Sequence, residues 1–203
     1  MIGGLLLLAA FSAVAQERGS GLEITPFIGY GIGGEFEDND SDTTLELDEA
    51  GSYGLIFNWP SKGNTEWEVY LGRQPTEVDV VGAIPSQASF DIDIDYLQLG
   101  GTYLFEGNQA IPFFVATIGA SRFDPGESGL GAETYFAFSA GGGVKLLPNK
   151  RIGFRLEGRL FGTLVDSGTN IFCQGGAGAT CSFQTNGTVL WQWQLSAGLI
   201  IRL

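Results

Sequence analysis

Apolar and polar residues alternate with a period of two along most of the chain, which is the pattern of β-strands with two different faces. The pattern is clearest at the end of the sequence, where one face would carry Val189, Trp191, Trp193, Leu195, Ala197, Leu199, Ile201 and Leu203. The opposite face would carry Gln192, Gln194, Ser196, Gly198 and Arg202. This segment predicts a strand that separates an apolar environment from a polar one.

Seven further segments bring the prediction to eight strands and no helix. The clear ones lie at 53–59, 66–72, 135–146 and 151–161, and the weaker ones cover 22–32, 90–105 and 111–123. In 90–105 the odd positions are aspartates up to Asp95 and then Leu97, Leu99, Gly101 and Tyr103, with the change of phase near Tyr96. A β-bulge would explain this change of phase. We favour a strand that leaves a membrane, because outside the bilayer the outward face of a strand no longer has to be apolar.

The connections between these segments alternate in length. The short ones are rich in Pro, Gly and Asn and cover Pro60–Thr65, Glu106–Ala110 and Pro148–Lys150. The long ones cover 34–49, 74–89, 124–132 and 164–187. An up-and-down meander would place all long loops at one end, as bacterial outer-membrane barrels do with an even number of strands. The sequence therefore predicts an all-β fold, an eight-stranded antiparallel up-and-down transmembrane β-barrel.

Aromatic residues gather near the predicted strand ends, as in the two aromatic girdles of a membrane barrel. Near the short turns they are Trp59, Trp67, Tyr103, Phe105, Phe113 and Phe154. Near the long loops they are Tyr30, Phe123, Tyr135, Phe161 and Trp191. The alternative is a secreted soluble barrel of the lipocalin type, whose interior is apolar and whose exterior is polar. The aromatic girdles and the alternation of long and short connections favour a membrane barrel, in which the apolar face of each strand points outward.

With these features the chain resembles the small eight-stranded outer-membrane β-barrels of Gram-negative bacteria, of the OmpA and OmpX types. The residues that carry the resemblance are Ile24-Thr25-Pro26-Phe27-Ile28-Gly29-Tyr30 with Gly33-Gly34, Ile111-Pro112-Phe113-Phe114, Ile118-Gly119-Ala120, Ala140-Gly141-Gly142-Gly143-Val144 and the closing Trp/Gln strand. The family usually ends in an aromatic residue that the barrel assembly machinery reads, and Leu203 stands there. The OmpW type, proposed to pass small apolar molecules, is a neighbour. The resemblance implies an integral protein of the cell outer membrane, with outer-membrane lipid, lipopolysaccharide and the assembly machinery as partners.

With apolar residues facing lipid, the polar face of each strand points into the barrel. The charged residues expected there are Glu66, Glu68, Lys145, Arg155, Glu157, Arg159 and Arg202. Eight strands leave an interior that side chains can fill, and buried charges must pair or meet water. Bidentate pairs between arginines and carboxylates would serve this purpose. The charges then form either a polar plug or the lining of a narrow, gated or ion-selective pore.

Composition removes several other functions. Ten basic against 23 acidic residues give a formal net charge of −13, which argues against nucleic-acid binding. The chain has no His, which removes His-based catalysis and imidazole metal sites. Glu66 and Glu68, two apart on one strand of a packed barrel, leave no cleft for glycosidase chemistry. We expect no enzymatic activity and no cofactor.

The first residues predict export. An apolar run from Ile2 to Ala10 precedes Ala13-Val14-Ala15, an A-x-A cleavage signal, so residues 1–15 are expected to be a signal peptide and 16–203 the barrel domain. In an oxidising compartment, Cys173 and Cys181, which bracket a Gly-rich segment, are expected to form a disulfide.

The first long loop is acidic. Asp38, Asp40, Asp42 and Glu49 stand at positions 1, 3, 5 and 12 of the EF-hand spacing, with Thr43 where the turn requires Gly. This makes them a weak candidate for loose Ca²⁺ or Mg²⁺ binding, against the simpler interpretation of a solvated loop. The function expected is structural or surface interaction through acidic and disulfide-closed extracellular loops that meet a surface ligand still to be identified. The alternative is a narrow channel for small solutes or small apolar molecules.

Overall fold

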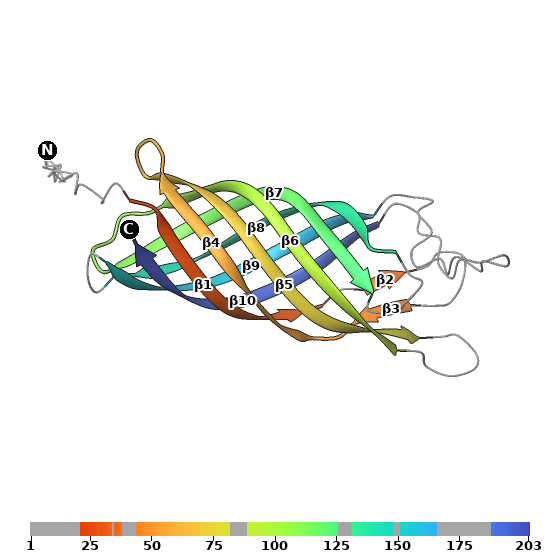
Figure 1. Cartoon of the computed structure of the whole chain (residues 1–203). Coiled ribbons are helices and arrows are strands. Elements are labelled where there is room, and N and C mark those ends of the chain that lie inside the picture. Colours follow the sequence, from red (N-terminus) through yellow and green to blue (C-terminus); the bar gives the residue numbers. More distant parts are fainter. Residues whose placement is uncertain are drawn as a thin grey trace, which may run out of the picture.

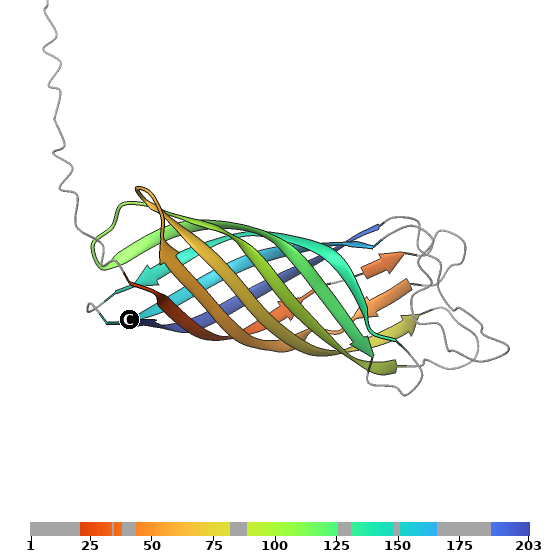
Figure 2. The ribbon, with the colours of Figure 1, turned by 45° about the horizontal axis from the view of Figure 1, so that its top comes forward.

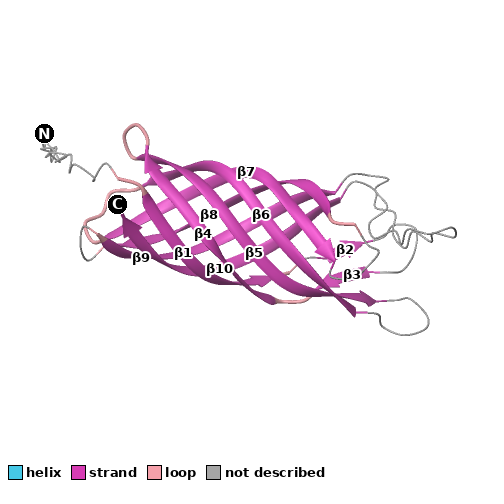
Figure 3. Cartoon of the chain, viewed as in Figure 1, coloured by secondary structure: helices cyan, strands magenta, loops and turns pink. Residues whose placement is uncertain are grey.

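The computed structural model describes residues 21–33, 35–37, 44–81, 89–125, 131–147, 151–165 and 188–203. All regular elements in these ranges are strands (Figure 3). They are β1 (Glu23–Ile32), β2 (Glu35–Glu37), β3 (Thr44–Leu47), β4 (Ala50–Pro60), β5 (Thr65–Val81), β6 (Ser89–Leu104), β7 (Ala110–Pro125), β8 (Glu133–Leu146), β9 (Ile152–Val165) and β10 (Thr188–Arg202). Within the described ranges, no helix has the length and apolar character needed to cross a membrane.

Eight long strands close into an antiparallel barrel (Figure 1). The strands from β4 to β10 each pair with the next one along the chain. β1 pairs with β4 on one side and with β10 on the other, which closes the ring. The predicted eight-stranded antiparallel up-and-down barrel is confirmed.

The two short strands belong to the first long connection. β3 pairs with the last four residues of β5, from Leu47 opposite Val78 to Thr44 opposite Val81. β2 then pairs with β3, so this connection continues the sheet beyond the closed barrel. The sequence pattern of 34–49 predicts a loop, and the paired strands β2 and β3 correct this prediction.

The two ends of the barrel differ. The tight β4–β5 turn and the last residue of the chain lie at one end, and β2 and β3 lie at the other (Figures 1 and 2). In the tight turn, Gly63 has a φ of 65°, a left-handed conformation that glycine adopts without strain. We refer to these as the turn end and the loop end.

One predicted loop is mainly strand. The segment 74–89 was expected to be a long loop, but β5 continues through its first half, paired with β6. The reason for the error is that both faces are polar here: Gln74 and Thr76 are buried inside, whereas Pro75 and Glu77 are exposed outside. Backbone pairing with β6 holds this stretch in the sheet although its side chains do not alternate in polarity.

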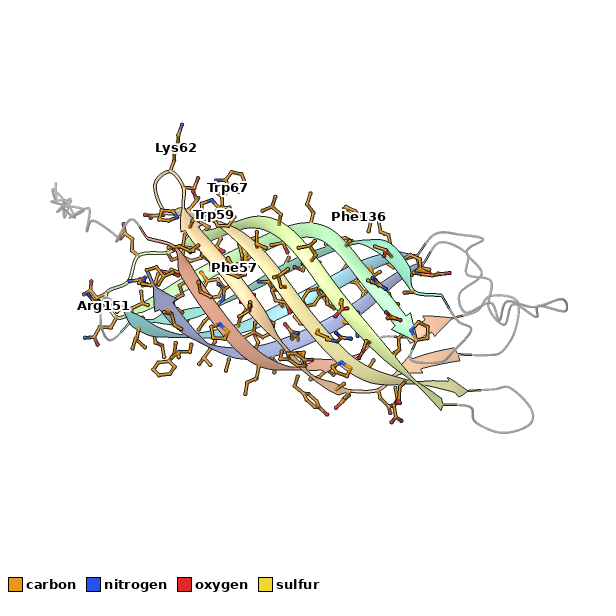
Figure 4. The ribbon with its side chains drawn as sticks, viewed as in Figure 1. Phe57, Trp59, Lys62, Trp67, Phe136 and Arg151 are labelled. Atoms are coloured by element: carbon orange, nitrogen blue, oxygen red, sulfur yellow. The ribbon has the colours of Figure 1, made fainter. Side chains whose placement is uncertain are left out.

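The apolar face of the strands points outward. Trp191 and Trp193 are 49% and 56% exposed, whereas Arg155 and Glu157 are 2% and 5% exposed. In Figure 4, Trp59 and Trp67 project from the wall near the β4–β5 turn and Phe136 projects from it nearer the loop end. This orientation excludes the lipocalin-type alternative.

The pairing of β6 explains its change of phase. It runs without interruption from Tyr103 opposite Thr65 to Ser89 opposite Asp79 on one side, and the register with β7 is equally continuous. There is thus no β-bulge in the paired part of β6. Asp93 and Asp95 continue the outward face of Leu97, above the apolar band.

The loop-end half of the lumen holds a large cluster of apolar side chains beside buried polar ones such as Gln74 and Thr76, and the sequence pattern does not predict this cluster. Its buried residues are Phe27, Ile56, Tyr70, Ile92, Ile94, Tyr96, Phe123, Phe161, Val165 and Leu190. The assignment of Phe113, Phe123, Phe161 and Tyr135 to the exterior girdles is wrong, because the three phenylalanines are buried inside and Tyr135 packs against the interior apolar cluster. Nearness to a strand end does not say on which face an aromatic residue lies.

Candidate functional site: the charged lumen

Four charged side chains form a closed ring in the lumen. Glu68 of β5 accepts from Arg155 Nη2 at 2.9 Å through Oε2 and from Arg159 Nη2 at 2.6 Å through Oε1. Glu157, between the two arginines on β9, accepts from Arg155 Nε at 2.6 Å and from Arg159 Nε at 2.7 Å. Each of the four side chains is at most 2% exposed. We call these four residues the central ring.

Strand alternation explains why the ring can form. Arg155, Glu157 and Arg159 occupy successive inward positions of β9, which places the carboxylate between the two guanidinium groups. β5 and β9 are four strands apart in both directions around the barrel. Glu68 therefore reaches the β9 charges from the opposite wall.

Neutral polar groups surround the ring. Asn58 accepts from Arg155 Nη1 at 3.0 Å and donates to Glu68 at 3.0 Å, and Thr102 donates to the same carboxylate at 2.8 Å. Thr117 and Ser139 each donate to the side-chain oxygen Oε1 of Gln98, at 2.7 Å in both cases. Such hydrogen bonds reduce the cost of burying four ions.

Aromatic rings lie against both guanidinium groups. Arg155 Cζ lies 4.4 Å from the ring centroid of Phe113, and Arg159 Cζ lies 4.4 Å from that of Tyr70. Both distances are typical of cation–π contacts. The sequence analysis missed both aromatic residues as parts of the site, although Tyr70 shares the inward face of Glu68.

A second network lies nearer the turn end. Lys145 Nζ of β8 contacts Glu23 Oε2 and Glu66 Oε2, each at 2.6 Å. Arg202 Nη2 of β10 contacts Glu23 Oε1 at 2.8 Å. Glu23 joins the two cations and was missed by the sequence analysis, whose reading of 22–32 did not assign faces. Alternation with the buried Thr25 and Phe27 is the signal that would have found it. We call Lys145, Glu23, Glu66 and Arg202 the turn-end network.

The two networks balance in charge. Their cations are Lys145, Arg155, Arg159 and Arg202, and their anions are Glu23, Glu66, Glu68 and Glu157. All seven residues proposed for the lumen from the sequence are thus placed in two neutral groups, with Glu23 as the eighth. A balanced set is what an interior of low dielectric tolerates.

Tyrosines connect the apolar cluster of the lumen to polar partners. Tyr70 Oη donates to Gln194 Oε1 at 2.9 Å, and Gln194 Nε2 donates to Ser52 at 2.8 Å. Tyr96 Oη donates to Gln192 Oε1 at 2.5 Å. The glutamines of the last strand, predicted to face inward, therefore bind hydroxyl groups from across the barrel.

Other predicted features lie outside the described residues. These are the signal peptide, Cys173, Cys181, Asp38, Asp40 and Asp42, so the disulfide and the cation site stay predictions. Glu49 is described, and its Oε2 accepts a hydrogen bond from Tyr30 Oη at 3.3 Å. Among the described residues, no group of three or more His, Cys, Asp or Glu side chains is placed to hold a metal ion.

Comparison with solved structures identifies the architecture. Neisserial surface protein A matches with a TM-score of 0.61 at 12% identity, over 90% of this chain and 97% of that chain. The outer membrane protein OprG from Pseudomonas aeruginosa matches with a TM-score of 0.62 at 13% identity, over 92% of this chain and 97% of that chain. The fold is that of the small outer-membrane β-barrels. No protein-family model matches the chain, and no curated protein is similar to it.

Proposed function

We propose that this chain is an integral, non-enzymatic protein of the outer membrane, with a plugged lumen and a structural or surface-interaction role. Two observations support the location: the exterior is apolar, and the solved structures of like fold are outer-membrane proteins. Lipid, lipopolysaccharide and the barrel assembly machinery are the proposed partners. The Neisserial barrel is a surface protein, which agrees with the role proposed here.

The central ring carries the proposal of a plug. Its bridges connect opposite walls, so a solute crossing the lumen would have to separate Glu68 from Arg155 or Arg159. Breaking a buried pair costs about 3–5 kcal/mol. Tyr70 and Phe161 lie against one another directly beside the ring, with centroids 5.5 Å apart, and add an apolar barrier.

Conductance across planar bilayers tests the plug. The wild-type chain is expected to give no steady unitary openings. The double variant Glu68→Ala/Arg159→Ala, which removes one cation and one anion from the ring, is expected to introduce openings. Glu77→Ala, on the exposed face of β5, is the matched control and should stay silent. Folding of each variant is checked by its mobility shift on boiling in detergent gels. Steady wild-type openings that are lost in Arg155→Gln would overturn the plug.

A narrow channel for small solutes or small apolar molecules is the second candidate. It is favoured by buried polar atoms without a hydrogen-bond partner among the described residues, namely Thr25 Oγ1, Gln74 Nε2 and Gln98 Nε2. Water in the lumen would satisfy such atoms. Swelling of vesicles that contain the chain, in small sugars of graded size, would reveal this activity.

A further inference from the structure

The exterior wall carries a groove near the loop end. It extends across β4 to β8 and has a volume of about 740 Å³, within the range of about 300–1,000 Å³ typical of small-molecule sites. Its apolar lining includes Leu55, Leu71, Leu97 and Ala120. These four residues lie opposite one another in successive strand pairs and form one continuous row.

We call these four apolar residues the floor of the groove. A row of polar side chains borders the floor on its loop-end side. In it, Arg73 lies opposite Asp95, and Asp95 lies opposite Arg122. Tyr53 on β4 and Thr134 on β8 continue the row at its two ends. All five line the groove, which therefore holds two guanidinium groups and one carboxylate. On each strand that contributes to the floor, the polar residue of this row stands two positions away from the apolar residue of the floor.

The remaining carboxylates of this region belong to a separate hollow above the row. It has a volume of about 670 Å³, and its acidic lining residues are Asp48, Glu49, Glu77, Asp91, Asp93 and Asp124, with no basic residue among them. The lining of the groove thus has a net formal charge of +1, from two arginines and one aspartate, whereas the charged residues of the second hollow are all anions. The groove over the apolar floor is the one that suits an anion.

The two arginines of the groove have N–H donors that their ion pairs leave available for a ligand. Arg73 contacts Asp93 at 2.5 Å and Asp95 at 3.6 Å, and Arg122 contacts Asp124 at 3.2 Å. The side chains of these pairs are 38–56% exposed, and exposed pairs contribute little. A guanidinium has five N–H donors. Its bidentate bonds to phosphate are stronger than an exposed pair with a carboxylate.

We propose that this groove binds one phosphorylated acyl lipid, with the acyl chain over the apolar floor and the phosphate between Arg73 and Arg122. The strands that carry the two arginines flank β6, so their backbones are about 10 Å apart, and two extended side chains can meet one phosphate. On binding, the phosphate would replace Asp93 and Asp124 as the partner of the two guanidinium groups, and the apolar floor selects a lipid over a free phosphate. The inference rests on the proposed membrane location.

Spin-labelled lipids test this proposal with the full chain in phosphatidylcholine vesicles. The probes are phosphatidic acid, diacylglycerol and phosphatidylcholine with the label on the same acyl position. Electron paramagnetic resonance then measures the fraction of each probe whose motion is restricted by the protein. Phosphatidic acid is expected to be restricted several-fold more than diacylglycerol, and added inorganic phosphate is expected not to remove this preference.

Two variants test whether the groove causes the preference for phosphatidic acid. Arg73→Gln/Arg122→Gln is expected to abolish the preference for phosphatidic acid. Ala120→Phe fills the floor and is expected to lower the restricted fraction of that probe while both arginines remain. Arg151→Gln, an exposed arginine in the β8–β9 turn at the opposite end (Figure 4), is the control and should behave as wild type.

Four outcomes would count against the proposal or its basis. Equal restriction of phosphatidic acid and diacylglycerol, or an undiminished preference in the double arginine variant, would overturn the phosphate site. Loss of the preference on adding inorganic phosphate would mean that the acyl chain plays no part, which would overturn the lipid as ligand. A chain that restricts none of the three probes is not inserted, and this result would overturn the membrane location instead.

Discussion

Arg159 of β9 and Glu68 of β5 bridge the full width of the barrel, with Nη2 and Oε1 2.6 Å apart. The strands that carry them are four apart in both directions around the ring. Glu68 also holds Arg155 at 2.9 Å, so a single carboxylate ties one wall to two cations of the other. The stability of the whole barrel is therefore sensitive to this one side chain.

Glu68→Gln should be strongly destabilising. It removes one of the two carboxylates of the central ring and leaves Arg155 and Arg159 to share Glu157. Loss of one partner from a buried ionic group costs about 3–5 kcal/mol. Urea unfolding in lipid vesicles, followed by tryptophan fluorescence, measures the change. Glu77→Gln, on the exposed face of the same strand, should unfold like wild type. Equal midpoints for the two variants would refute the structural role of the ring.

Lys145→Met should lower the free energy of unfolding more than Glu23→Gln does. Without Lys145, Glu66 loses the cation 2.6 Å away, and Glu23 keeps only Arg202. In Glu23→Gln, by contrast, Lys145 keeps Glu66. The free energies of unfolding of the two single variants and the double variant form a thermodynamic cycle, and we expect a coupling of about 1–3 kcal/mol. Strictly additive effects would argue against the contact.

Gly54→Ala should destabilise the barrel, whereas Gly51→Ala on the same strand should not. A Cβ at Gly54 would lie 2.8 Å from the ring of Phe27 and closer still to the backbone of Leu71, but at Gly51 nothing lies within 4 Å. Overpacking of this kind costs about 1–3 kcal/mol. Thermal unfolding in detergent compares the two variants, and a larger effect at Gly51 would contradict the packing described.

The tryptophans should contact lipid. All four of the chain, Trp59, Trp67, Trp191 and Trp193, lie on the exterior and are 36–56% exposed. In vesicles of brominated phosphatidylcholine, their fluorescence should be strongly quenched relative to unbrominated vesicles. Lipids brominated at different depths should separate Trp59 and Trp67, near the turn end, from Trp191 and Trp193. Fluorescence that bromine leaves unchanged would place this face outside the bilayer.

The predicted disulfide has a direct chemical test. Alkylation of the unfolded chain without reductant should leave Cys173 and Cys181 unmodified, and prior reduction should expose both. Mass spectrometry of the segment between Val165 and Thr188 reads the result. Two alkylated thiols without reductant would show that the pair is not joined in the mature chain.

The outward and inward faces could be predicted from the sequence because a strand reverses its side chains at every residue. One clear apolar stripe, such as that of Trp191 and Trp193, therefore fixes the environment of Gln192 and Gln194 as well. Where both faces are polar, as at Gln74 and beyond, this signal is absent and the strand was taken for a loop. Alternation thus identifies strands with an apolar outer face well and a strand above the apolar band poorly.

The residues of the site could be found from the sequence, but not their partners. Alternation placed Glu68 and Arg159 on the inward face, yet which of the facing walls meet depends on the closure and register of the barrel. Glu23 was missed for a simpler reason, because no faces were assigned to 22–32, although alternation places Glu23 on the same face as Thr25 and Phe27. The aromatic residues beside Arg155 and Arg159 needed three-dimensional packing, since Phe113 also fitted a girdle.

The turn-end network draws its members from the first strand, β1, and the last, β10. Glu23 meets its cations only when the sheet curls round far enough to join its own edges. In a membrane, a sheet whose edges had not yet met would leave Glu23 without its two cations, Lys145 and Arg202. Closure is therefore expected to accompany insertion, and reopening the seam between β1 and β10 would separate Glu23 from Arg202.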